Sequence, residues 1–286
     1  ARGEPFPVAI AIGVDPSVLI AVVSPFPFGV DELAMAGALR GEPLEMVPCE
    51  TIPLHVPAHA EIVLEGEIPA DTLHEEGPFG EFTGYYGVKS RRPVIEIKAI
   101  THRNGAIHQA SYEGKPPQET NVLQGISIEG EIMKLVSLPG IRGIHVTEGG
   151  CGSFNAVVSI EKRFEGYGKM MAMAILGCWA GRTIKTLIVV DEDIDPYNWT
   201  EVEWALATRM QPHQSVEIIK DVTGLVLDPS LPLAERLSGN SRTSKLIIDA
   251  TRYDAKEFEV VCTPKKEAVE KVEREWGKYG IPLPAR

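Results

Sequence analysis

Residues 74–87 read HEEGPFGEFTGYYG and hold three carboxylates and four glycines within fourteen positions. Glu76 and Glu81 are five residues apart, a spacing that puts two side chains on opposite faces of a strand and well apart around a helix. A reverse turn over residues 77–80 would bring them together, because proline presets φ at its second position and glycine suits its fourth. We therefore predict that a turn directs both carboxylates toward one small volume.

Two carboxylates held in this way would not titrate normally. Crowding, or burial beside Phe79 and Phe82, favours the protonated form that a general acid needs. The alternative is an ordinary β-hairpin whose glutamates face water, which is typical of acidic turns. The density of glycine and aromatic residues in this stretch favours a functional site over that alternative.

The bulk composition limits the classes of function. The chain has 286 residues, of which 44% are hydrophobic and 24% charged, the profile of a globular protein with one large or two ordinary domains. A net charge of −12 argues against binding to nucleic acid or to an anionic membrane surface, since both need clustered lysine and arginine. Chemistry on a small molecule is favoured instead.

The cysteines and the apolar runs bear on the compartment. The four cysteines are scattered and form no C-x-x-C pair, so we expect reduced thiols and a cytoplasmic location. No run approaches eighteen apolar residues, and the first residues lack the pattern of a signal peptide.

The first hundred residues predict a β-rich, barrel-like domain. Short runs rich in valine and isoleucine are bounded by proline and glycine, which is typical of strands. A helix is expected at 30–41, where apolar residues follow helical spacing and Gly41 ends the run. The expected strands are 7–13, 18–24, 45–57, 60–68 and 93–101.

Beyond about residue 120 the pattern changes to alternating helices and strands, which predicts an α/β domain. Thr200 and Glu203 have capping-box spacing, and Thr263 with Pro264 predicts the start of a C-terminal helix. The expected helices are 126–140, 164–181, 198–210 and 263–280, and the expected strands are 140–150, 186–195, 244–254 and 258–264.

Other motifs carry no defined chemistry. The glycine-rich residues 148–153 precede a strand, whereas a dinucleotide-binding loop follows one. The histidines show no paired metal-ligand spacing, and residues 190–195 lack the downstream glutamate of a calcium loop. Residue chemistry alone therefore indicates a two-domain protein with one unusual carboxylate pair and no assigned reaction.

The motif EGPFGEFTGYY at 76–86 resembles the signature of the UbiD-like family of reversible decarboxylases, which use prenylated flavin mononucleotide. Further stretches agree in order and spacing, among them PVAIAIGVDP, DELAMAGALRGEPLEMV, GKPPQET, YNWTEVEWALATRMQP and SKLIIDAT. The resemblance spans essentially the whole chain. It implies a mixed α+β fold: a partial split β-barrel flavin-binding domain at 1–118, an α/β oligomerisation domain at 119–264, and a C-terminal helix and tail at 265–286.

The resemblance also implies roles for particular residues. Glu81 would pass a proton to the carbon that CO₂ leaves, and Glu76 would join an ionic network with an arginine. Glu32 would ligate Mn²⁺ or Mg²⁺ at the flavin phosphate, and backbone carbonyls at 21–24 would help to hold K⁺. The expected cofactor-binding residues are Ala21, Val22, Ser24, Pro25 and Glu32.

The implied substrate is an aromatic or α,β-unsaturated carboxylic acid, with weaker pointers to residues 118–126 and 228–233 as the pocket lining. A flavin prenyltransferase would supply the cofactor, and a homo-oligomer is expected. Acid catalysis of this kind accelerates proton transfer by about 10² to 10⁴.

One departure from the family is clear. Members carry upstream an asparagine and a histidine that bind the metal and the arginine of the glutamate network, but here the first histidine is His55 and the first asparagine Asn104. Arg2 and Arg40 precede the motif without matching the family context. We therefore expect the chain to be the C-terminal part of a longer enzyme. A non-catalytic assembly subunit that pairs with a separate N-terminal chain is the alternative.

Overall fold

The computed structural model describes residues 3–239, 241–254 and 257–282. Arg2 and the last four residues of the predicted tail lie outside these ranges. The chain divides into two compact units, residues 1–251 and residues 252–286. The predicted boundary at 118/119 falls inside the first unit and stays a prediction.

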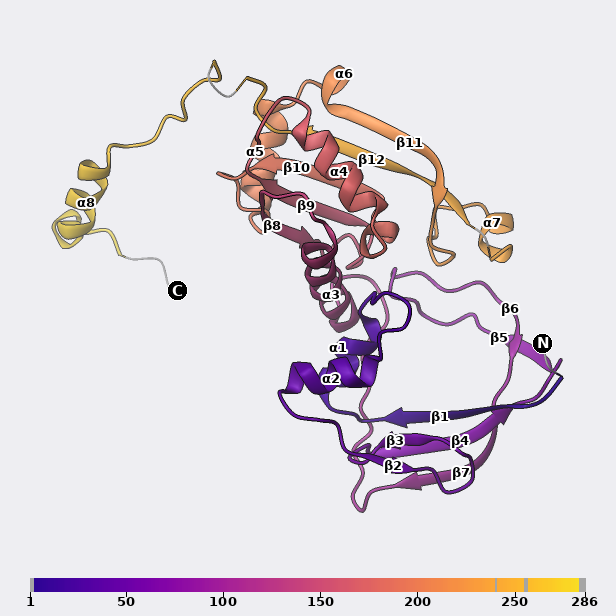
Figure 1. Cartoon of the computed structure of the whole chain (residues 1–286). Helices are drawn as coiled ribbons and strands as arrows, with labels where there is room; N and C mark the ends of the chain where they lie inside the picture. Colours follow the sequence, from indigo (N-terminus) through magenta and orange to yellow (C-terminus); the bar gives the residue numbers. More distant parts are fainter. Residues whose placement is uncertain (1–2, 240, 255–256, 283–286) are drawn as a thin grey trace. The chain divides into compact units, whose positions relative to one another are not determined.

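A three-stranded antiparallel sheet forms the first part of the larger unit, in the order β1-β4-β7 (Figure 1). Its central strand carries Glu65, whose buried carboxylate accepts hydrogen bonds from the backbone N–H groups of Glu50 and Thr51 at 2.9 and 2.7 Å. Two separate hairpins, β2–β3 and β5–β6, accompany the sheet. The strands are β1 (Phe6–Ile12), β2 (Met46–Pro48), β3 (His55–Pro57), β4 (Ile62–Ile68), β5 (Leu73–Glu76), β6 (Ser90–Pro93) and β7 (Glu96–His102).

Two short helices follow β1. α2 (Glu32–Arg40) confirms the predicted helix, and Gly41 ends it in the left-handed conformation with φ +85°. The strand predicted at 18–24 is wrong, because α1 (Pro16–Val23) occupies this stretch. Asp15 caps the helix by accepting from the Ser17 N–H, and proline suits a first helical turn. A fully apolar run does not by itself distinguish a buried helix from a buried strand.

The second part of the larger unit is a five-stranded sheet in the order β11-β12-β10-β9-β8. β9, β10 and β12 pair in parallel, while β8 and β11 pair antiparallel at the two edges. The strand at β11 was not predicted from the sequence. The strands are β8 (Ile141–Val146), β9 (Asn155–Ile160), β10 (Thr186–Asp191), β11 (Val216–Thr223) and β12 (Arg242–Ala250).

Helices cover both faces of this sheet (Figure 1). α3 and α4 pack on one face around Ile132, Met171 and Ile175, which are fully buried. α5 packs on the other face through Val202 and Ala205. The helices are α3 (Glu119–Leu135), α4 (Tyr167–Gly177), α5 (Trp199–Arg209), α6 (Pro212–Ser215) and α7 (Leu233–Leu237), with a 3₁₀ turn η1 (Ala180–Thr183).

The capping box predicted at Thr200 and Glu203 is wrong by two residues. Asn198 is the N-cap of α5, and its side-chain oxygen accepts from the Thr200 N–H at 3.2 Å. Three residues on, Glu201 accepts from the Asn198 side chain. Asparagine caps helices at least as well as threonine, so the helix begins at the earlier polar residue.

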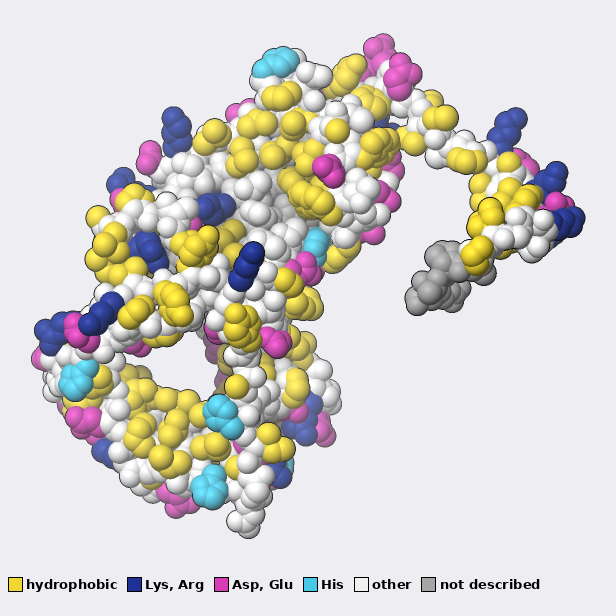
Figure 2. Space-filling view, turned by 180° about the vertical axis from the view of Figure 1, so that it is seen from behind, with side chains coloured by type: hydrophobic (Ala, Val, Ile, Leu, Met, Phe, Trp, Pro, Cys, Tyr) yellow, Lys and Arg dark blue, Asp and Glu magenta, His cyan; other side chains and the backbone are white. Residues whose placement is uncertain are grey.

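The smaller unit contains α8 (Lys266–Arg274) and the 3₁₀ turn η2 (Trp276–Tyr279). Lys265 rather than Thr263 is the N-cap, without a side-chain hydrogen bond. Figure 2 shows hydrophobic side chains gathered beside lysines and arginines along α8. The strand predicted at 258–264 is wrong, because no strand pairs with these residues in the described chain and most of them are exposed.

The mixed α+β class is confirmed, whereas the described strands close no barrel. All four cysteines are free thiols. In the described part of the chain, no helix combines the length and apolar character needed to span a bilayer.

Candidate active site

The signature residues lie in the loop that joins β5 to β6. β5 ends at Glu76, which pairs with Ser90 across the hairpin, and Glu81 lies inside the loop. The predicted reverse turn at 77–80 is wrong. The tight turn is formed four residues later, where the Gly84 N–H donates to the Glu81 carbonyl at 2.8 Å and Gly84 adopts φ +82°.

The two glutamates do line one cavity, as predicted, together with aromatic and basic side chains. The cavity measures about 60 Å³. A water molecule takes up roughly 30 Å³, so the space suits a carboxylate group rather than a whole aromatic ring. The lining side chains outside the loop are Arg92 on β6, Val226, Leu227, Arg236 and Leu237.

The glutamates differ in their surroundings. Glu76 has 53% of its side chain exposed, and Arg92 Nε lies 3.9 Å from its Oε2. Burial raises the pKa of Glu81, and the nearby carboxylates of Glu113 and Glu76 raise it further against the opposing charge of Arg236. The alternative of a hairpin glutamate that faces water therefore applies to Glu76. Glu81, by contrast, is the carboxyl whose surroundings favour its protonated form.

Glycines in the loop allow a second segment to lie against it. A Cβ added at Gly80 would stand 2.6 Å from the Glu113 carbonyl oxygen, and one at Gly84 would stand 2.8 Å from Lys115 Cα. Gly87 faces Glu81 itself, with an added Cβ 3.0 Å from Oε1. The glycine content of the motif is therefore explained by close approach of residues 113–116 and of the Glu81 carboxyl.

Four of the five predicted cofactor-binding residues lie at the end of α1 or directly after it. Val22 lines a separate cavity of about 420 Å³ between the end of β1, α1 and the first residues of α3. The Ala21 carbonyl accepts from the Ser24 N–H at 3.1 Å, and the Ser24 carbonyl accepts from the Phe26 N–H at 2.8 Å. Pro25 follows directly. Residues 21–24, whose carbonyls were expected to help to hold K⁺, are thus the last turn of a helix and its cap.

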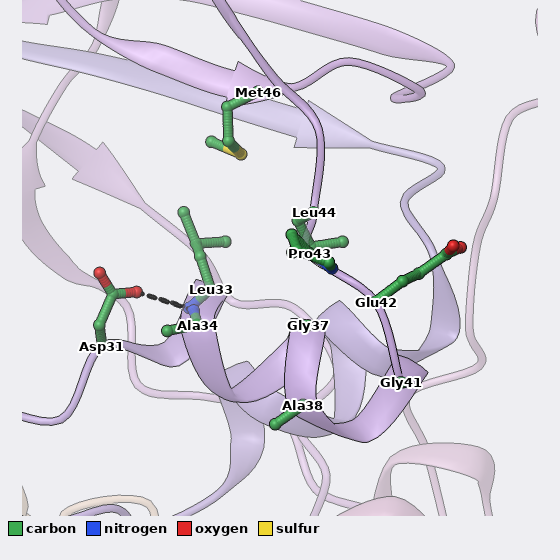
Figure 3. A pocket seen from close by; sticks show the side chains of 10 residues that line it. All are labelled: Asp31, Leu33, Ala34, Gly37, Ala38, Gly41, Glu42, Pro43, Leu44 and Met46. Carbon is green, nitrogen blue, oxygen red and sulfur yellow. Dashed lines mark hydrogen bonds between the residues drawn. The ribbon is translucent and has the colours of Figure 1, made fainter.

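Glu32 is exposed at the start of α2 and lines none of these cavities. Its neighbour Asp31 caps the helix, accepting from the backbone N–H groups of Leu33 and Ala34 at 2.9 and 3.0 Å (Figure 3). Asp31 also lines a cavity of about 700 Å³ under α2. In the described residues no three metal-ligating side chains come together, so these residues do not complete a metal site at Glu32.

Sequence reasoning missed Arg92, Arg236 and Glu113. The hairpin register offered a signal for Arg92, since it lies diagonally across from Glu76 two residues beyond its partner. Glu113 and Arg236 are 32 and 155 residues from Glu81 in the sequence, and no local pattern links them. Only the fold brings them together.

Comparison with known proteins decides the family. Residues 1–116 match the Rift-related domain of 3-octaprenyl-4-hydroxybenzoate carboxy-lyase, and residues 121–250 match its C-terminal domain. The chain belongs to the UbiD family. The predicted glutamates lie in the first UbiD domain and Arg236 in the second, so both domains contribute to one cavity.

Solved UbiD-class structures share the fold. HmfF from Pelotomaculum thermopropionicum in complex with FMN is 38% identical over 95% of this chain and 60% of that chain, with a TM-score of 0.81. Vanillic acid decarboxylase from Sedimentibacter hydroxybenzoicus in closed form is 32% identical over 97% and 59%, with a TM-score of 0.82. Apo 3,4-dihydroxybenzoic acid decarboxylase (AroY) from Klebsiella pneumoniae is 32% identical over 95% and 59%, with a TM-score of 0.79. The chain thus spans about three fifths of these proteins.

Proposed function

We propose that this chain forms part of a reversible, non-oxidative decarboxylase that uses prenylated FMN and acts on an aromatic or α,β-unsaturated carboxylic acid. The observation that carries this proposal is Glu81, a half-buried carboxyl with a raised pKa in a carboxylate-sized cavity. UbiD membership and the flavin complexes of HmfF support it.

The chemistry assigns Glu81 as the proton donor. Breaking the bond to the carboxylate releases CO₂ and leaves an electron pair on the substrate carbon. When bound, the prenylated flavin would supply the electron-accepting chemistry that stabilises this charge. Glu81 then gives its proton to the same carbon, a C–H bond replaces the C–C bond, and the glutamate is left ionised until solvent reprotonates it. In the carboxylation direction, the same carboxylate accepts the proton.

The other charged groups would orient the reactants. Arg236 faces Glu81 and opposes the rise of its pKa, and Arg92 stands beside Glu76. Guanidinium groups bind carboxylates in a planar, bidentate manner, so both arginines suit the reacting carboxylate. The small cavity would hold that carboxylate, with the rest of the acid outside it.

The apolar cavity beside Val22 fits a flat aromatic ring in size and character, since ligand pockets commonly measure about 300–1,000 Å³. Val22 lines this cavity and would border the cofactor there, and the expected contributions of Ala21, Ser24 and Pro25 belong to the same proposal. The barrel-like flavin domain, the homo-oligomer and the supply of cofactor by a prenyltransferase belong to the same proposal. HmfF has been solved in an evolved dimeric form with prenylated FMN.

The described residues do not complete a metal site. Glu32 would supply one hard oxygen ligand to Mn²⁺ or Mg²⁺, and carbonyls at 21–24 would supply ligands to K⁺. The remaining ligands are not among the described side chains, because no cluster of three metal-ligating groups is present there. No reaction step is therefore assigned to the metal.

The experiment is CO₂ release from a panel of aromatic and α,β-unsaturated acids, using the intact protein that contains this chain, co-expressed with a flavin prenyltransferase. We expect release by the parent protein and a loss of at least about 100-fold in Glu81→Gln, the lower end of what general acid catalysis contributes. Glu75→Gln is the matched control, because Glu75 is 71% exposed, pairs with Lys89 and does not line the cavity. Undiminished turnover in Glu81→Gln would refute the assignment. Flavin binding without turnover of any acid would favour the assembly-subunit alternative.

A further inference from the structure

The backbone carbonyl of Phe82, the residue after Glu81, accepts hydrogen bonds from two side-chain amides. Gln118 Nε2 donates to the Phe82 carbonyl oxygen at 3.0 Å, and Asn121 Nδ2 donates to the same oxygen at 3.1 Å. Gln118 is the N-cap residue of α3, and Asn121 lies in its first turn. Two donors from one helix start therefore converge on the backbone next to the candidate acid.

Both amides are held in place themselves. Gln118 is 6% exposed, and its amide both donates to the Gly114 carbonyl at 3.2 Å and accepts from the Gly114 N–H at 3.3 Å. Asn121 is fully buried and also donates to the Cys151 carbonyl at 3.2 Å. The two amides are thus also hydrogen-bonded to Gly114, which precedes α3 in the sequence, and to Cys151, which follows it.

Burial of these amides is costly without full hydrogen bonding. Within the described structure Asn121 Oδ1 is buried and has no partner, while its amino group makes two bonds. An apolar side chain of similar size would avoid that cost if the position served packing alone. Donation toward the Phe82 and Cys151 carbonyls is therefore the feature that accounts for the Asn121 amide.

Further contacts hold the loop around Glu81 in place. The Glu81 N–H donates to the Tyr85 carbonyl at 3.0 Å, and the Glu81 carbonyl accepts from the Gly84 N–H. The buried ring of Phe82 lies 6.0 Å from that of Phe154. Backbone bonds fix Glu81 within the loop, whereas the amides and the ring fix the loop against the second domain.

We propose that Gln118 and Asn121 are positioning residues, which hold the Phe82 carbonyl and thereby keep the Glu81 carboxyl at the cavity that it shares with Glu76 and Arg236. The inference rests on the proposed function of Glu81 as the acid. Loss of either amide would loosen the loop and admit water around the carboxyl.

The test uses Gln118→Met and Asn121→Leu, each of which keeps the side-chain volume and removes the donors. Ser127→Ala is the matched control, because Ser127 is buried on the same helix and loses one hydrogen bond, to the Leu123 carbonyl, without contact to the loop. Amide hydrogen exchange is followed by mass spectrometry in peptides covering 77–89. We expect exchange there to be about tenfold faster in both variants, because each removes one of the two hydrogen bonds to the Phe82 carbonyl, and unchanged in Ser127→Ala. Unchanged exchange of β9 and β10 peptides shows that the core remains folded.

The pH dependence of CO₂ release shows whether the two amides position the Glu81 carboxyl or only stabilise the loop. CO₂ release falls as pH rises through the pKa of the acid, so greater hydration of Glu81 moves this fall to lower pH in both variants. Faster loop exchange together with that move supports the inference. Unchanged exchange at 77–89, or faster exchange with an unmoved pH profile, overturns it. Absence of CO₂ release from the intact protein would refute the proposed function instead, and the exchange rates would still decide whether the two amides hold the loop.

Discussion

Glu76 and Glu81 face the same cavity but meet different surroundings. Glu76 is on the open hairpin beside Arg92, whereas Glu81 is enclosed by loop glycines and by the segment that carries Glu113. Glycine is required where the segment approaches, because any Cβ would meet backbone atoms there. The motif therefore partly buries the Glu81 carboxyl next to the carboxylate of Glu76.

The raised pKa of Glu81 has a consequence for stability. The folded chain holds this proton more tightly than the unfolded chain, so ionisation above the folded pKa destabilises the fold. We expect Glu81→Gln to have a higher Tm than the parent chain at pH 7. The gain should vanish as pH falls below the ordinary value of 4.5. Thermal unfolding across pH 4 to 8 measures this, and a lower Tm for Glu81→Gln at pH 7 would contradict it.

Gly84 combines a left-handed backbone with a close neighbour, having φ +82° and Lys115 Cα 2.8 Å from an added Cβ. The backbone conformation alone costs a residue with a side chain about 1–2 kcal/mol. Overpacking adds about 1–3 kcal/mol, so Gly84→Ala should lose more stability than a glycine that has only the backbone requirement.

Gly105→Ala is the matched comparison, since Gly105 has φ +70° and no atom within 4 Å of an added Cβ. Urea unfolding of the two variants gives the difference directly. Equal losses would show that residues 113–116 do not press on the loop.

Among the helices and strands, those marked by residue spacing and by turn residues at their ends were predicted correctly from the sequence. The helix at α2 was recognisable from its spacing and from Gly41, and the run at β1 from its flanking turns. The apolar run at 18–24 was misassigned as a strand because the run alone does not reveal its surroundings. Val18 and Ala21 pack against Ala36 of α2, which only the fold shows. β11 escaped notice because it is an exposed edge strand with few buried residues.

β12 contains a buried ammonium. Lys245 is 4% exposed, and its Nζ donates to the carbonyls of Arg182 and Ile184 at 2.7 and 2.6 Å near η1. Burial lowers the pKa of Lys245 to about 8, from an ordinary value of 10.5. Between these two values the unfolded chain binds more protons than the folded chain, so the free energy of unfolding should rise with pH there.

Lys245→Met removes this titration while keeping most of the side-chain volume. We expect the stability of the parent chain relative to that variant to increase between pH 8 and pH 10, as measured by urea unfolding at each pH. A difference that stays constant across this range would show that the lysine keeps its ordinary pKa in the fold.

At the scale of the whole molecule, the two units differ in what holds them. The larger unit contains both core clusters of the five-stranded sheet, whereas no described residue of 252–286 is buried. Local unfolding and proteolysis favour segments with few buried contacts. We expect limited digestion with a glutamate-specific protease to cut first among residues 257–275 and to leave a resistant product containing residues 3–251, followed by mass spectrometry. Protection of α8 at protease levels that cleave the larger unit would contradict this.

Sequence alone thus predicted the mixed fold, most strands and helices, and the meeting of Glu76 with Glu81. It could not identify Glu113, Arg236 or the amides of Gln118 and Asn121 as neighbours of the acid loop, because these contacts link distant segments. The residues carried over from the family signature, including Glu32 and the end of α1, lie in places that sequence patterns alone would not distinguish as a site.

We expect the fold to hold Glu81 as a proton-carrying acid. Titration of the side-chain carboxyl of Glu81 in the parent chain by ¹³C NMR tests this, with the signal assigned through Glu81→Gln. We predict a midpoint above the ordinary 4.5. A midpoint at or below 4.5 would mean that Glu81 is an ordinary carboxylate, and the account of this site would be wrong.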